Sequence, residues 1–278
     1  MVRHVFGRSP VVHGGAYRAG TLAAVLVAHA ALPALIALAF GLWCAGCLVV
    51  AHRVAPWLAA RCGGDPITGI MAEVVRVYCR LVHRVRFEHA STETAALAER
   101  THPGPLVVVS NHTAGIDPLL IQSGLHAHVR WMMERAMMVP ALDWLWRHQR
   151  MIPVDFDAGD ASAARAAVAH VRNGGVLGIF PEGGLARPPE HVLPFLPGVG
   201  LVVARTGAPV LLCWVSGTPR RRRSLQSLAA CSRSRVVFVD VVRYPPRARP
   251  TEIAEDLRRR LVDASGWPAH DRAPQTGP

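Results

Sequence analysis

Lysine is absent from this 278-residue sequence, and all 31 basic residues are arginines. The absence excludes chemistry that needs a lysine amine, including Schiff-base catalysis and the lysine-containing P-loop of nucleotide-binding proteins. Acidic residues number only 19, so the formal net charge is +12. This excess indicates an anionic partner: a membrane surface, an acidic carrier protein, a phosphorylated ligand or a nucleic acid.

Charged residues of both signs are scarce, at 18%, whereas hydrophobic residues make up 51% and the mean hydropathy is +0.23. This composition excludes a mainly disordered chain and favours membrane association. The six cysteines have neither a disulfide framework nor zinc-site spacing, which indicates a reducing cytoplasmic setting. His126 and His128 flank Ala127 without an evident third ligand, so we expect no metal site.

Residues 21–51 contain no Asp, Glu or Arg, and a membrane-spanning helix needs about 20 apolar residues. Because Pro33 divides the stretch, it forms one long kinked span, two shorter helices in a membrane-embedded hairpin, or a buried hairpin of a soluble protein. Arginines flank it on both sides, which suits a hairpin with both ends in the cytoplasm. We predict a membrane-associated leader over residues 1–65, in the cytoplasmic membrane, with the catalytic domain on the cytoplasmic side.

Beyond residue 65, short apolar runs alternate with helical patterns, which predicts an α/β fold whose mostly parallel sheet is flanked by helices. We expect this domain to cover residues 66–263 and to be followed by a disordered tail over 264–278. The predicted strands are 106–110, 129–133, 151–154, 176–180, 210–215 and 236–242. The predicted helices are 67–87, one starting near 117, 141–148, 161–173, 198–206 and 251–262.

The segment Ser110–Leu120, SNHTAGIDPLL, carries the first candidate chemistry. Asp117 followed by Pro118 predicts a helix start with the aspartate as N-cap, and it places His112 in the preceding loop. If the chain folds back, the carboxylate orients one ring nitrogen and leaves the other free to accept a proton. The alternative is that Asp117 only caps a helix and His112 is an ordinary loop residue.

The segment Val176–Gly184, VLGIFPEGG, predicts a second strand that ends in a turn carrying Glu182. Ligands bind at the carboxyl ends of strands in open α/β sheets, so the loops of His112 and Glu182 could share one crevice. The alternative is that Glu182 is an exposed turn residue.

Together these segments resemble the glycerolipid (lysophospholipid) acyltransferase family, which includes the 1-acylglycerol-3-phosphate acyltransferases. The family's N-H-x₄-D motif is matched by Asn111, His112 and Asp117, and its F-P-E-G motif by Phe180–Gly183. The apolar segment Ala208–Val215 is similar to its fourth motif, and the resemblance covers residues 105–220.

The resemblance implies that His112 removes the proton of an acceptor hydroxyl, oriented by Asp117. The alkoxide then attacks an acyl thioester, acyl-CoA or acyl carrier protein, which is the donor substrate; no cofactor is implied. The acceptor is a membrane lyso-lipid. The residues that the resemblance implies in substrate binding are Asn111, Arg150, Phe180, Pro181, Glu182, Gly183, Gly184 and Arg187.

Two arginines that bind acceptor phosphate in the family are missing at their usual positions, which hold Phe156 and Leu185. Either Arg150 or Arg187 replaces them from a neighbouring position, or the acceptor carries no phosphomonoester. Two other functions compete with acyl transfer. The first is a catalytically silent, lipid-binding relative. The second is a nucleic-acid binder, which we do not expect because the sequence lacks an aromatic-basic stacking motif.

Overall fold

The computed structural model describes residues 36–61, 65–155, 161–219 and 224–271. The chain divides into two compact units, Met1–Ala55 and Pro56–Pro278. The predicted boundaries at residues 65 and 263 stay predictions.

The apolar leader is helical from residue 36, through a π-helical turn η1 (Val50–Val54) into α2 (Ala55–Arg61). Its stretch Ile36–Leu58 is 23 residues long and apolar enough to cross a membrane, and none of its most apolar window is buried. Pro33 and the first part of the leader lie outside the described residues, so the choice between one span and a hairpin stays open.

The second unit is built on a seven-stranded sheet in the order β1-β7-β6-β2-β5-β3-β4. Strands β6, β2, β5, β3 and β4 run parallel, β7 is antiparallel to β6, and β1 is parallel to β7. The predicted mostly parallel sheet is therefore confirmed. The strands are β1 (Arg86–His89), β2 (Leu106–Ser110), β3 (Val129–Glu134), β4 (Ile152–Val154), β5 (Val176–Ile179), β6 (Val210–Ser216) and β7 (Arg235–Val242).

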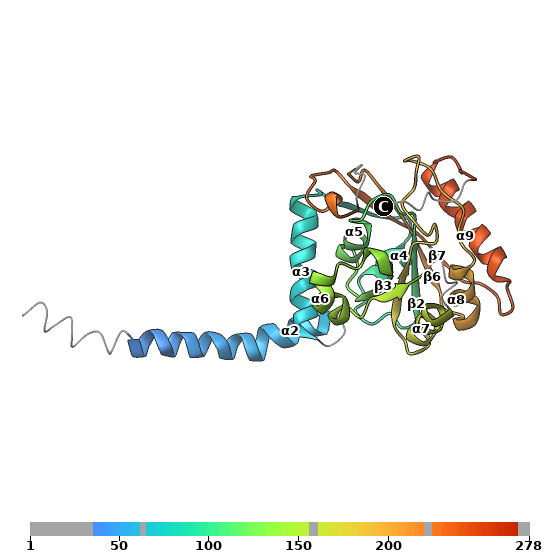
Figure 1. Cartoon of the computed structure of the whole chain (residues 1–278). Coiled ribbons are helices and arrows are strands. Elements are labelled where there is room, and N and C mark those ends of the chain that lie inside the picture. Colours follow the sequence, from blue (N-terminus) through green and yellow to red (C-terminus); the bar gives the residue numbers. More distant parts are fainter. Residues whose placement is uncertain (1–35, 62–64, 156–160, 220–223, 272–278) are drawn as a thin grey trace, which may run out of the picture. The chain divides into compact units, whose positions relative to one another are not determined.

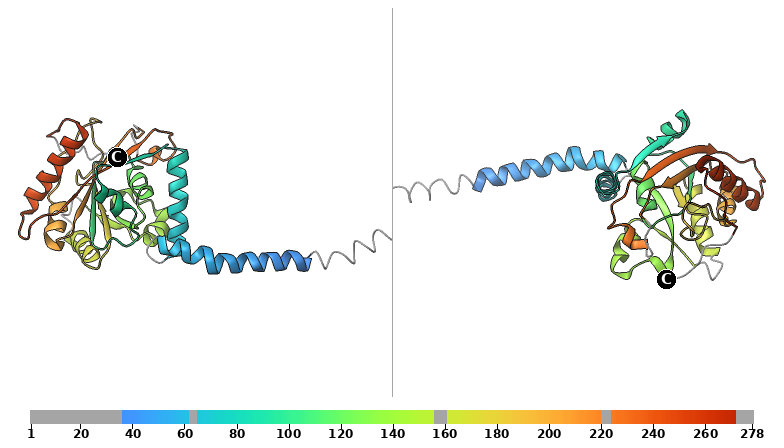
Figure 2. Two further views of the ribbon diagram at one scale, coloured as in Figure 1. Left: turned by 180° about the vertical axis from the view of Figure 1, so that it is seen from behind. Right: turned by 90° about the horizontal axis from the view of Figure 1, so that it is seen from above.

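Helices cover both faces of this sheet (Figures 1 and 2). One face packs on α7, α8 and α9, and the other packs on α3, α4 and α5. The helices are α3 (Pro66–Leu81), α4 (Thr92–Ala98), α5 (Asp117–Ser123), α6 (Asp143–His148), α7 (Ala161–Arg172), α8 (Gly198–Thr206) and α9 (Pro250–Ser265). The 3-10 turns are η2 (Arg135–Met137), η3 (Pro140–Leu142) and η4 (Ser224–Ser227).

Strand β2 shows why the central strands read as unbroken apolar runs. Val107 and Val109 belong to the core on the α7–α9 face, whereas Leu106 and Val108 belong to the core on the α3–α5 face. Successive side chains of a strand point to opposite faces, so a strand covered on both faces must be apolar at every position.

The predicted helix over residues 67–87 is too long. α3 ends at Leu81, Arg84 adopts a left-handed backbone with φ 43°, and the chain then forms β1. β1 pairs with β7, more than a hundred residues later in the chain, so its partner left no local signal. The short helix α4 has no counterpart among the predicted helices.

The expected disorder over residues 264–278 is wrong for the part that the structure describes. Residues 264 and 265 belong to α9, and the His270 amide donates to the Val192 carbonyl at 3.0 Å. Trp267 packs edge-on against Trp214, with ring centroids 5.6 Å apart. One large aromatic side chain thus holds a segment that otherwise lacks an apolar pattern; residues 272–278 lie outside the described chain.

Candidate active site

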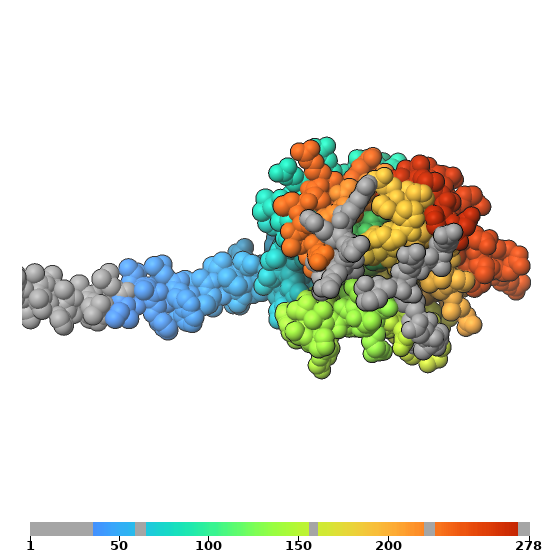
Figure 3. Space-filling model, turned by 45° about the horizontal axis from the view of Figure 1, so that its top comes forward, coloured from blue at the N-terminus to red at the C-terminus, as the bar shows by residue number. Residues whose placement is uncertain are grey.

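His112 lies two residues beyond β2, at the carboxyl edge of the sheet. Its Nδ1 is 3.0 Å from Oδ2 of Asp117, so the loop brings together the pair that the sequence predicts. The aspartate is fully buried, while 19% of the histidine side chain is exposed. Figure 3 views this side of the molecule, and the green of the chain around β2 and α5 is visible there between yellow and orange segments.

Asp117 does not cap its helix, contrary to the prediction. α5 begins at Asp117 itself, the N-cap position is Ile116, and no side-chain cap bond is present there. The carboxylate instead faces back into the preceding loop, where its Oδ2 accepts from the Thr113 amide at 2.6 Å and the Ala114 amide at 2.8 Å. Backbone donors therefore hold the orienting group in place.

The His112 ring lies against an aromatic stack. Its centroid is 4.1 Å from that of Phe180 with the rings inclined by 17°, and Phe180 stacks in turn on Trp131 at 5.0 Å. The loop after β5 therefore fixes the plane of the imidazole. A side chain at Gly178 would collide with Trp131, because a Cβ there would lie 2.3 Å from the indole.

Glu182 is completely buried in the same loop, against the alternative of an exposed turn residue. Neither carboxyl oxygen makes a hydrogen bond with the residues that the structure describes. Burial raises the pKa of Glu182 well above its usual range and the charge of Asp117 adds to this, while backbone amides of His112 and Leu193 act to lower it. The group is therefore a neutral carboxylic acid over the pH range where an ordinary glutamate begins to ionise.

The remaining residues of the F-P-E-G turn shape its backbone. The Pro181 carbonyl accepts from the Leu196 amide at 2.7 Å, and Gly183 has a left-handed φ of 73°, which a glycine adopts without strain. Gly184 follows, half-buried. These contacts set the path of the loop that carries Phe180 and Glu182.

Asn111 is buried and points away from the histidine toward β6. Its Nδ2 donates to the Val215 carbonyl at 2.9 Å, and its Oδ1 accepts from the Val215 amide at 2.8 Å. Both ends of the side chain are thus engaged by one backbone residue, which favours a structural role for Asn111 over contact with substrate.

Arg187 joins the site, whereas Arg150 does not. The Arg187 guanidinium donates to the carbonyls of Ala186 at 2.8 Å and Thr113 at 3.4 Å, so it lies beside the catalytic loop. Arg150 precedes β4, and its backbone carbonyl accepts from the guanidinium of Arg130, near the amino end of β3. Its charge acts there on His128 and Arg130. Arg150 cannot replace a phosphate-binding arginine beside His112; Phe156 itself lies outside the described residues.

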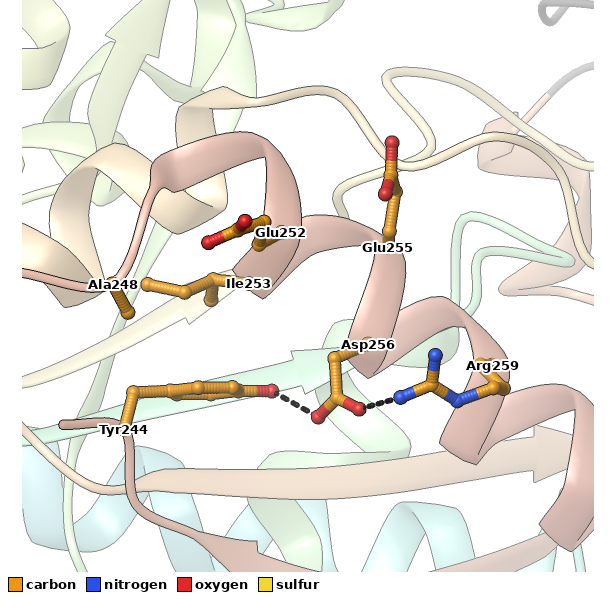
Figure 4. Close-up of a pocket in the computed structure, with 7 residues that line it drawn as sticks. All are labelled: Tyr244, Ala248, Glu252, Ile253, Glu255, Asp256 and Arg259. Atoms are coloured by element: carbon orange, nitrogen blue, oxygen red, sulfur yellow. Dashed lines mark hydrogen bonds and ion pairs between the residues drawn. The ribbon is translucent and has the colours of Figure 1, made fainter.

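A shallow groove of about 340 Å³ between the end of β7 and α9 is a separate feature (Figure 4). In it the Tyr244 hydroxyl donates to Asp256 at 2.9 Å. β7 is antiparallel to β6, so Tyr244 also lies at the amino edge. The groove therefore has no part in the His112 site.

Sequence reasoning missed three side chains of the site. Thr113 and Thr218 each contribute a hydroxyl, with their Oγ1 atoms 2.8 Å apart, and Trp131 backs the ring stack. Thr113 lies inside the N-H-x₄-D motif at a position that the motif leaves open. Thr218 and Trp131 carried no signal, because their approach depends on which strands are neighbours.

Comparisons with known proteins concern the family and the fold. The model of the Acyltransferase family matches residues 86–216. The fold is similar to the crystal structure of the 1-acyl-sn-glycerophosphate (LPA) acyltransferase PlsC from Thermotoga maritima, with a TM-score of 0.52 and 18% identity over 69% of this chain and 78% of that chain. No curated protein matches the sequence significantly. The predicted family resemblance and the predicted fold are thereby confirmed.

Proposed function

We propose that this chain, whose residues 86–216 match the model of the Acyltransferase family, transfers a fatty acyl group from a thioester to the hydroxyl of a lyso-lipid at a membrane. The observation that supports the mechanism is the 3.0 Å contact between His112 Nδ1 and the buried Asp117. A carboxylate at that nitrogen fixes the proton on Nδ1 and leaves the lone pair of Nε2 available as a base.

The proposed transfer needs no covalent intermediate on the protein. His112 Nε2 takes the proton of the acceptor hydroxyl, and the resulting oxygen attacks the thioester carbonyl. The new C–O bond forms as the C–S bond breaks, and the imidazolium returns its proton to the departing thiolate. Asp117 stabilises the imidazolium between these steps. The buried cysteines cannot serve as nucleophiles, because burial raises the pKa of Cys79 to about 11 and that of Cys213 still further.

Arg187 is the cation we assign to the acceptor's anionic group. A guanidinium suits a phosphate because its N–H donors form a planar fork. Its donation to the Thr113 carbonyl puts that charge next to the base. We therefore choose Arg187 over Arg150 for this role, and a phosphorylated acceptor is part of the proposal.

Two apolar features support attachment to a bilayer. The first is the candidate span Ile36–Leu58. The second is one face of α3. Five aliphatic side chains at helical spacing leave between 50% and 73% of their surface exposed on that face: Ile67, Ile70, Val74, Val77 and Leu81. We propose that this face lies in the lipid interface, where an apolar stripe on a helix is stable.

Turnover of a thioester by the purified full-length chain tests the catalytic proposal. Acyl-CoA and acyl carrier protein are offered as donors, and lysophosphatidate and an uncharged lyso-lipid as acceptors, with thiol release and lipid product both measured. We expect acceptor-dependent release by the wild type and a loss of about 10³-fold in His112→Ala. His128→Ala, at the amino edge, is the matched control and should keep the wild-type rate. Lipid binding without turnover would instead identify a catalytically silent relative.

Membrane washing tests the attachment. Apolar insertion resists both high salt and alkali, whereas attraction of a +12 protein to anionic lipid is screened by salt. The full-length chain should remain in the membrane fraction through both washes, and release by salt alone would contradict insertion.

A further inference from the structure

Two threonine hydroxyls form a hydrogen-bonded chain that reaches the carboxylate of Asp117. Thr113 Oγ1 lies 3.2 Å from both Oδ1 and Oδ2 of Asp117. It also lies 2.8 Å from Thr218 Oγ1. Within the part of the chain that the structure describes, Oδ1 of Asp117 has no other hydrogen-bond partner than this hydroxyl.

The chemistry of the four groups sets the direction of the hydrogens. An ionised carboxylate only accepts, so the Thr113 hydroxyl must donate to Asp117. Its lone pairs then accept from Thr218, and the other oxygen of Asp117 accepts the Nδ1 hydrogen of His112. The chain therefore runs in one direction, from Thr218 through Thr113 to Asp117, and His112 donates to the same carboxylate.

Thr218 is placed by the end of β6. β6 pairs with β2, so the two strands deliver Thr218 and Thr113 to the same edge, although 105 residues separate them. Between β6 and Thr218 stands Gly217, which has a left-handed φ of 69°. A Cβ at this glycine would lie 2.3 Å from the Arg233 carbonyl oxygen, so the turn that aims Thr218 requires glycine.

We propose that Thr113 and Thr218 are positioning residues for His112. Their hydroxyls hold the Asp117 carboxylate in the rotamer that receives Nδ1–H, and they link the base to the loop after β6. The inference rests on the proposed function for its kinetic effect, but the tautomer of His112 follows from the geometry alone.

The tautomer is the first measurement. The full-length protein carries ¹⁵N-labelled histidine, and the His112 signal is assigned by its loss in His112→Gln. When the ring is neutral, the wild type should hold the proton on Nδ1. Thr113→Val should shift part of the population to the Nε2–H form, and Thr113→Ser should restore the wild-type spectrum because serine keeps the hydroxyl. A wild-type tautomer in Thr113→Val would overturn the proposal.

The kinetic measurement separates positioning from binding. We expect Thr113→Val to lower kcat about tenfold with little change in KM, and Thr218→Val to lower it about threefold, because the second acts only through the first. In the Asp117→Asn background neither substitution should cost more. Additive losses in that background would mean that the hydroxyls act independently of Asp117, and would overturn the proposal.

Controls keep this result apart from the proposed function. Thr251→Val, an exposed position in the first turn of α9, should match the wild type in both measurements. If the wild type transfers no acyl group, the proposed function fails and the tautomer alone decides this inference. Thermal unfolding of each variant shows whether a loss reflects a destabilised fold.

Discussion

The surroundings of His112 and those of Arg150 differ in the titratable side chains that they bury. Around His112 the fully buried titratable groups are acids, Asp117 and Glu182. At the amino edge His128, Arg130 and His170 are partly buried, and burial lowers the pKa of each. The protein carries an excess of arginine everywhere, so the difference does not follow from composition.

Strand and helix direction explain the difference. Parallel strands lead into helix N-termini at the carboxyl edge, where unpaired backbone N–H groups favour anions, and they are preceded by helix C-termini at the amino edge, which favour cations. The loop before α5 supplies the amides of Thr113 and Ala114 to Asp117, whereas His170 lies in the last turn of α7. The carboxyl edge therefore favours a carboxylate that orients a base. Three predictions contrast the two edges.

The largest effect should come from the two aspartates. We expect Asp117→Asn to lower kcat at least about 100-fold, because asparagine keeps the shape but loses the charge that stabilises the imidazolium. Asp256→Asn, at the amino edge, should change kcat less than about twofold. Steady-state kinetics with near-UV circular dichroism as a fold control checks both. Wild-type turnover by Asp117→Asn would remove Asp117 from the mechanism.

The two arginines should differ by a smaller factor. Arg187→Ala should lower kcat/KM for lysophosphatidate about tenfold and leave an uncharged acceptor almost unaffected, because only the first presents a phosphate to the guanidinium. Arg150→Ala should leave both acceptors within about twofold of the wild type. An equal loss in the two variants would show that phosphate binding does not distinguish the edges.

The smallest effect concerns stability against pH. The folded pKa of Glu182 is raised above its usual 4.5, so the folded state binds more protons there and the free energy of unfolding falls as pH rises above that value. The stability of Glu182→Gln relative to the wild type should therefore increase as the pH rises above 4.5. Asp256 has the opposite sign: burial alone would raise its pKa, but hydrogen bonds from Arg260 and Tyr244 lower it overall.

That lowered pKa means that Asp256 stabilises the folded state above pH 4, and the contribution is lost as pH falls below it. The stability difference between wild type and Asp256→Asn should accordingly shrink on acidification. Urea unfolding of the three proteins, measured both below pH 4 and above pH 4.5, checks both signs. Parallel curves for wild type and Glu182→Gln would mean that Glu182 is not held neutral.

The sequence predicted the pair at the site and missed what supports it. His112 and Asp117 lie in one short loop, so their contact depends on local backbone alone. Arg150 could not be placed from the sequence, because its contact with Arg130 depends on which strands are neighbours. Thr218 was missed because nothing local reveals that β6 is the neighbour of β2.

The central strands were easier to predict from the sequence than the strand β1 at the edge of the sheet. The buried strands β2 and β5 show as apolar runs because the sheet is covered on both faces. β1 has only one strand neighbour and is mostly exposed, so it lacks both the run and the alternation that predict a strand, and its residues continued the pattern of α3.

The side chain of Asn111 continues the hydrogen bonding between β2 and β6 beyond the end of the β2 backbone. Its carboxamide presents a donor and an acceptor to Val215 as a peptide group would, so the ladder to β6 continues while the main chain is already turning toward His112. An aspartate at 111 would set two oxygens against the Val215 carbonyl and amide, and a leucine would leave both without a partner. The chain can therefore turn away from β2 at His112 because the preceding residue, Asn111, has an amide side chain of this length.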